Sequence, residues 1–133
     1  MSLQTDSPAV EFARRHMEAY SGGDLAAARG NVAENVQADT NGVHLDGIEA
    51  YMAGLARFAA ILDPGSLRVL AARGDQHQAI IMTEHTAGGQ PLPSARTFEL
   101  DENEKITAER VVFFGLAVMA VRPLARRRRP ARP

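Results

Sequence analysis

The sequence predicts an α+β fold, in which N-terminal helices pack on a mainly antiparallel sheet. Up to Leu62, apolar residues recur every three or four positions, which is the spacing of amphipathic helices. After Asp63-Pro64-Gly65 the pattern changes to alternation with short turn-type links, which is typical of strands. Helices followed by a meander favour this class over alternating βαβ units.

Two helices are expected before the first strand. Ser7 is a helix cap and Pro8 occupies the first helical position, so the first helix runs to Tyr20 and ends at a Ser-Gly-Gly sequence. Asp24 caps a short second helix that ends at Gly30-Asn31. The first helix has one apolar stripe, made of Ala9, Phe12, Ala13, His16, Met17 and Tyr20.

A short strand at residues 36–39 is expected next, followed by a turn at Asn41-Gly42 and a long helix capped by Asp46. Gln37 and Asp39 share one face of that strand, because side chains alternate along a strand. That face is either solvent-exposed surface or the lining of a pocket. The long helix has the clearest apolar face, made of Ile48, Tyr51, Met52, Leu55, Phe58, Ala59 and Leu62.

Four further strands are expected at residues 67–72, 79–87, 96–100 and 106–121. Residues 1–121 are expected to form one domain, since a chain of 133 residues can bury a real core. The chain has no cysteine, which excludes disulfides and thiolate chemistry. No apolar run approaches the roughly 20 residues of a membrane span, and the N-terminus has no signal-peptide core, so a cytoplasmic protein without a membrane span is expected.

Charge is unevenly distributed along the chain. Six of the 15 basic residues lie in the last 12 positions, which contain no acid, so residues 1–121 hold 9 basic groups against 16 acidic ones. An acidic body is a poor nucleic-acid binder. Residues 122–133 are expected to be a basic, disordered tail. The alternative is that this tail binds nucleic acid in a salt-sensitive way that truncation after Arg122 would abolish.

The order of elements resembles the nuclear-transport-factor-2-like superfamily, and within it the SnoaL-like polyketide cyclases and the ketosteroid isomerases. The likeness rests on HMEAYSGGDLAAA (16–28), VQADTNG (36–42) with DGIEAYMAGL (46–55), and GGQPLPSARTFELDENEKITAERVVFF (88–114). The resemblance implies a cone-shaped, cystatin-like fold with a strongly curved sheet, which binds small apolar molecules inside the cone. The superfamily holds enzymes and pure binding modules, so fold alone does not decide the activity.

The resemblance implies that the strand face of Gln37 and Asp39 lines the cavity. It also implies a catalytic role for Asp39, which falls where the isomerases place their proton-shuttling aspartate. The spacing is one residue shorter here, and Thr40 replaces the proline that follows that aspartate. A carboxylate in an apolar cavity has a raised pKa and is a better base near neutral pH. The alternative is a turn aspartate that accepts a backbone N–H.

His16 matches the tyrosine that donates a hydrogen bond to the substrate oxyanion in the isomerases. It could donate there or act as an acid or base, and Tyr20, one turn on, could add a hydroxyl to the same cavity. The alternative is that both residues belong to the core.

Arg96 matches the protonated aspartic acid of the isomerases' oxyanion hole. An arginine there argues against steroid isomerisation by that mechanism. If residues 101–104 form a tight turn, Arg96 lies roughly opposite Glu109 on the next strand. The pair could bind a carboxylate or polarise a carbonyl, or it could be a structural ion pair.

The remaining expected ligand contacts follow from strand alternation and the resemblance. The residues expected to face the cavity are Ile81, Thr83, His85, Phe98, Val111 and Phe113. Val112 and Phe114 should lie on the other face with Ile80 and Met82. A second subunit often covers that face in this superfamily, so a homodimer is expected.

No organic cofactor or metal is expected. The four histidines are scattered, and the sequence has no HExxH, GxGxxG, P-loop or GxSxG motif. The first functional hypothesis is isomerisation, aldol-type cyclisation or dehydration of a small apolar molecule that is carbonyl-bearing or polyketide-like. The alternative is a non-catalytic module for ligand binding or dimerisation.

Overall fold

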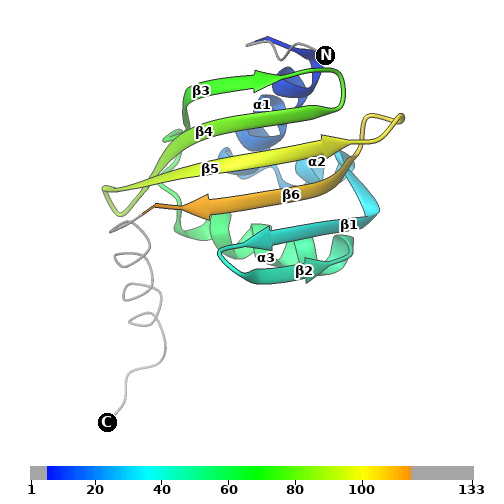
Figure 1. Ribbon diagram of the computed structural model, residues 1–133. Coiled ribbons are helices and arrows are strands. Elements are labelled where there is room, and N and C mark those ends of the chain that lie inside the picture. The colour runs from blue at the N-terminus through cyan, green and yellow to red at the C-terminus, as the bar shows by residue number, and fades with distance from the viewer. Residues whose placement is uncertain (1–5, 115–133) are drawn as a thin grey trace.

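The computed structural model describes residues 6–114, which form three helices and six strands. The helices are α1 (Pro8–Ser21), α2 (Leu25–Gly30) and α3 (Ile48–Ile61). The strands are β1 (Val32–Thr40), β2 (Val43–Asp46), β3 (Arg68–Gly74), β4 (Gln78–Ala87), β5 (Gln90–Leu100) and β6 (Ile106–Phe113). Figure 1 shows the helices gathered on one face of a curved sheet. The α+β prediction, with helices on a curved and mainly antiparallel sheet, is confirmed.

The strands lie in the order β2-β1-β6-β5-β4-β3. β3 to β6 form the expected antiparallel meander. β1 pairs with β6 in parallel, and β2 is antiparallel to β1 at the edge of the sheet. The sheet therefore joins an early segment of the chain to its last described strand.

The caps predicted for the first two helices are present. The Ser7 hydroxyl accepts a hydrogen bond from the Val10 N–H at 3.1 Å, with Pro8 in the first turn of α1. The Asp24 carboxylate accepts from the Ala27 N–H at 3.0 Å and starts α2. These bonds satisfy donors that have no partner inside the helix.

The chain between the predicted first strand and the long helix differs from the sequence prediction. Residues 43–46 form β2 where a turn and loop were expected. Asn41 and Gly42 supply the hairpin turn, with φ angles of 47° and 86°. Asp46 does not cap α3: it ends β2 and accepts a hydrogen bond from the Gln37 side chain at 2.6 Å, while Gly47 occupies the cap position.

β5 begins six residues earlier than predicted. The turn before it consists of Gly88 and Gly89 alone, with φ angles of 57° and 77°. Pro91 and Pro93 lie inside the strand. The Pro93 carbonyl accepts from the Phe114 N–H, so both proline nitrogens face the side of β5 on which β6 ends. The ladder between β5 and β4 therefore loses no bond, which is why the strand tolerates both prolines.

The outer face of the sheet carries several exposed apolar side chains. Ile80, Met82, Val112 and Phe114 lie there, as predicted, and Leu70 joins them. No described helix covers this face (Figure 1). The homodimer remains a prediction that this face supports. The predicted extension of the last strand to residue 121 and the basic tail lie outside the described residues.

Among residues 6–114, no helix has both the length and the apolar character that crossing a membrane requires.

Candidate active site

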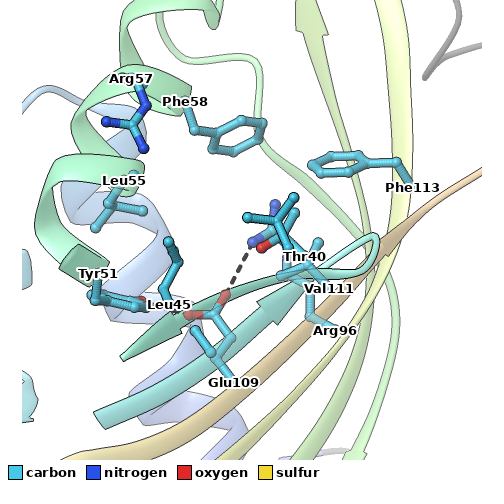
Figure 2. A pocket seen from close by; sticks show the side chains of 13 residues that line it. Thr40, Leu45, Tyr51, Leu55, Arg57, Phe58, Arg96, Glu109, Val111 and Phe113 are labelled. Atoms are coloured by element: carbon cyan, nitrogen blue, oxygen red, sulfur yellow. Dashed lines mark hydrogen bonds and ion pairs between the residues drawn. The ribbon is translucent and has the colours of Figure 1, made fainter. Parts of the chain in front are cut away.

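A pocket of about 250 Å³ opens between α3, β2 and the ends of β1 and β6. Figure 2 shows the side chains of α3 facing those of the sheet across it. The residues that line the pocket are Ala38, Thr40, Val43, Leu45, Tyr51, Gly54, Leu55, Arg57, Phe58, Arg96, Glu109, Val111 and Phe113. Most are apolar, so the pocket suits a small apolar molecule that has one polar group to match Arg96 and Glu109.

A buried ion pair forms one side of this pocket. Arg96 Nη1 lies 3.2 Å from Glu109 Oε2, and the two residues are only 2% and 4% exposed. Phe98 is the direct partner of Glu109 in the ladder, so Arg96 reaches Glu109 along a diagonal and is not directly opposite it. The guanidinium also lies over the Phe58 and Phe113 rings, with its Cζ 5.4 and 5.8 Å from their centroids.

A chain of hydrogen bonds leads from the protein interior to the Glu109 carboxylate. The Tyr51 hydroxyl donates to Glu109 Oε1 at 2.5 Å, and His16 Nε2 lies 2.8 Å from the Tyr51 oxygen. Asn31 Nδ2 lies 3.3 Å from His16 Nδ1. Because the amide nitrogen can only donate, His16 Nδ1 accepts and Nε2 carries the ring proton. Every donor in the chain therefore points toward Glu109.

Burial shifts the pKa values of the side chains in this chain of hydrogen bonds. It raises the pKa of Glu109, against the opposing effects of Arg96 and the Tyr51 hydrogen bond. It also raises the pKa of Tyr51 well above its usual value, and Glu109 adds to that shift. Burial, with the Arg96 charge, lowers the pKa of His16 to about 3. His16 is therefore neutral near pH 7, and the carboxyl of Glu109 is a proton acceptor of increased basicity.

Asp39 does not lie in the pocket, and the expectation that its face of the strand lines the cavity is wrong. The inward residues of β1 are Val36 and Ala38, so Asp39 lies on the opposite face, with its side chain 43% exposed. Its carboxylate lies 2.9 Å from His44 Nδ1 and 3.9 Å from Arg110 Nε. His44 itself lies in β2. Asp39, His16 and Arg96 therefore do not converge on one space.

The other predicted contacts divide into two groups. Arg96, Glu109, Val111 and Phe113 line the pocket as expected. A second group is fully buried and does not line the pocket: His16, Tyr20, Ile81, Thr83, His85 and Phe98. Within this group, Thr83 bonds to Ser94 at 2.9 Å, and His85 Nε2 lies 3.0 Å from the Ser21 hydroxyl.

Three residues that contact Arg96, Glu109 or His16 in the site were not identified as functional from the sequence. Tyr51 and Phe58 were assigned only to the apolar face of the long helix, and Asn31 only to the end of α2. Tyr51 carried a signal, because a buried tyrosine hydroxyl needs a partner and usually finds one. Asn31 carried none, because its contact with His16 depends on how α2 joins β1.

Among residues 6–114, no group of three or more histidine or acidic side chains is arranged to hold a metal ion. The polar groups of the pocket are a cation, a carboxyl and a hydroxyl, a set suited to proton transfer or to binding a polar organic group.

Comparison with known proteins assigns this chain to a family. A family model described as the SnoaL-like domain matches residues 13–109. The chain belongs to the SnoaL-like domain family. No curated protein matches this SnoaL-like chain. The match includes both Arg96 and Glu109.

Solved structures share the fold of this SnoaL-like domain. A protein from Kribbella flavida DSM 17836 is 24% identical, with a TM-score of 0.78 over 92% of this chain and 99% of that one. A protein with a cystatin-like fold from Silicibacter pomeroyi DSS-3 is 19% identical, with a TM-score of 0.75 over 94% of this chain and 87% of that one. A protein with a ketosteroid isomerase-like fold from Catenulispora acidiphila DSM 44928, in complex with trimethylamine, is 18% identical, with a TM-score of 0.70 over 86% and 92%.

Proposed function

We propose that this SnoaL-like domain is an enzyme that moves a proton at the carbon next to a carbonyl group in a small apolar molecule. The observation that carries the proposal is the buried Arg96–Glu109 pair beside an apolar pocket of about 250 Å³. Isomerisation, aldol-type cyclisation and dehydration all begin with such a proton transfer. The reaction needs a base, a nearby positive charge and exclusion of water.

In this proposal Glu109 replaces Asp39 as the base. The C–H bond breaks, its proton goes to a Glu109 oxygen, and the electron pair moves to the carbonyl oxygen as an enolate. Tyr51 and Arg96 hold the carboxylate at 2.5 and 3.2 Å and so orient it. The Arg96 charge favours the enolate electrostatically, because the surrounding aromatic rings keep the local dielectric low.

The non-catalytic alternative also has an observation in its favour. Each oxygen of Glu109 already accepts a hydrogen bond from a protein donor, which opposes the rise in basicity that burial causes. A module that only binds ligands would use the same pocket without proton transfer.

An exchange assay separates the two functions without knowledge of the natural substrate. A panel of small apolar ketones and oxo acids would be incubated with the protein in D₂O, and loss of the α-proton signal followed by NMR. We expect wild-type protein to accelerate exchange for at least one compound, and Glu109→Gln to reduce that rate by about 10²–10⁴-fold. Asp39→Asn serves as the matched carboxylate control and should retain full activity.

Binding without Glu109-dependent exchange would support the ligand-binding module. Loss of exchange in Asp39→Asn with full exchange in Glu109→Gln would overturn the assignment of the base.

A further inference from the structure

Four buried side-chain atoms in the described residues have no hydrogen-bond partner, and they come from only three residues. They are Tyr20 Oη, His85 Nδ1, Arg96 Nε and Arg96 Nη2. All three residues are at most 2% exposed. A buried donor without an acceptor is costly, so native proteins rarely keep several in one place without a reason.

These atoms belong to one cluster beside the pocket. The Tyr20 and His85 rings are stacked with centroids 6.3 Å apart. The Phe58 ring contacts all three residues, with centroid distances of 6.2 Å to Tyr20, 5.5 Å to His85 and 5.4 Å to the Arg96 Cζ. Phe58 and Arg96 both line the pocket, so this cluster adjoins the open space.

The unpaired edge of Arg96 has a defined chemical preference. Nη1 is used by Glu109, while Nε and Nη2 form the other edge of the guanidinium. Two parallel N–H groups on one edge match the two oxygens of a carboxylate. The cluster therefore has a donor pair for a planar anion.

The neighbouring side chains add further donors. Burial raises the pKa of Tyr20 to about 12, although the neighbouring Arg96 guanidinium acts to lower it, so the hydroxyl keeps its proton near neutral pH. Burial and the Arg96 charge lower the pKa of His85 to about 4, so that ring is neutral. When the Ser21 hydroxyl donates to His85 Nε2, the ring proton is on Nδ1, the unpaired nitrogen.

We propose that Arg96, Tyr20 and His85 form a subsite behind Phe58 that binds the carboxylate of a small apolar carboxylic acid. The unpaired atoms have almost no accessible surface, so the half-buried Phe58 ring turns aside to admit the carboxylate. The apolar part of the ligand then fills the pocket along α3. This inference rests on the proposed function, because it names the substrate class of the same pocket: apolar oxo acids, with the carbonyl on the Glu109 side.

The test uses phenylacetate and its neutral analogue phenylacetamide, which have nearly the same shape. Binding to the full chain would be measured by isothermal titration calorimetry at pH 7. We expect phenylacetate to bind at least about tenfold more tightly, because hydrogen bonds to a charged group are the stronger ones. Equal affinity for the two compounds, or no binding of either, would overturn the carboxylate subsite.

Variants test which residues hold the carboxylate. Arg96→Lys keeps the charge but loses the paired donors, and Tyr20→Phe removes only an unpaired hydroxyl. Both should weaken phenylacetate binding about tenfold or more and leave phenylacetamide unchanged. Tyr20→Phe should also unfold at the same or higher denaturant concentration, which separates ligand binding from a structural role. Phe58→Ala should bind phenylacetate at least as tightly as wild type, and weaker binding would contradict the route past Phe58.

Glu109→Gln separates this inference from the proposed catalytic function. It removes a negative charge next to the subsite, so phenylacetate should bind as tightly or more tightly, although α-proton exchange is lost. Weaker binding in Glu109→Gln would contradict the subsite. Tight binding with no exchange in the wild type would contradict only the catalytic proposal.

Discussion

Acidification should destabilise this domain well above the range in which surface carboxyl groups titrate, because two histidines are buried in the neutral form. The ordinary pKa of 6.5 falls to about 3 for His16 and to about 4 for His85, mainly through burial. A folded-state pKa below the unfolded value means that the unfolded chain binds more protons. The contribution to stability is therefore complete above pH 6.5 and is lost as the pH falls toward the folded-state values.

The magnitude at pH 5 depends little on the folded-state values, because both lie well below 5. Below pH 6.5 each group changes the free energy of unfolding by about 1.36 kcal/mol per pH unit. Lowering the pH from 7.5 to 5 should therefore cost about 2 kcal/mol for each histidine. The raised pKa of Glu109 acts in the opposite sense, because its contribution is largest at low pH and is lost as the pH rises.

The assay is urea denaturation between pH 7.5 and 5, with wild type compared with His16→Gln. Glutamine does not titrate and keeps a donor near the Tyr51 oxygen. The variant should start less stable, and its free energy of unfolding should fall by about 2 kcal/mol less than that of wild type over this range. Because Glu109 titrates in both proteins, the comparison isolates His16. Parallel pH profiles would refute a neutral buried His16.

Three further predictions concern stability and assembly. Arg96→Met and Glu109→Leu should each cost about 3–5 kcal/mol in urea denaturation, whereas the double variant should be close to wild type, since only the single changes leave an unpaired buried charge. Gly74→Ala should destabilise by a few kcal/mol, because a Cβ there would collide with the Gln78 carbonyl and lie 2.7 Å from the Ser7 hydroxyl; Gly30→Ala, with open space around it, should be neutral in the same assay. Val112→Lys, on the exposed outer sheet face, should convert the expected homodimer to a monomer in sedimentation velocity, and a wild type that sediments as a monomer would refute the dimer.

The fold was largely readable from the sequence because its signals are local. The caps at Ser7 and Asp24, the apolar stripes of the helices and the alternation after Gly65 depend on neighbouring residues only. β2 was missed because four residues, Val43 to Asp46, give too short a pattern between a turn and a helix.

The site was only partly readable, because it depends on pairings between distant segments. Arg96 and Glu109 were found together because they lie on adjacent strands of one hairpin. Asp39 was misplaced because the face of a strand cannot be fixed until its partner is known, and a shift of one residue exchanges the two faces. The Tyr51 contact spans 58 residues and has no local signature.

The parallel pairing of β1 with β6 has a consequence for how the domain assembles. β3 to β6 are joined by short links, so each can pair with its neighbour in the sequence. β1 pairs with β6, which begins only at Ile106. Contacts of such long sequence separation carry a high loop-closure cost and form late. The pocket lies across the junction of β1 and β6, with α3 and β2 on one side and Arg96 and Glu109 on the other. We therefore expect docking of β1 to be the step that completes the pocket, and a bound ligand to slow the separation of β1 from β6 more than that of the other strand pairs.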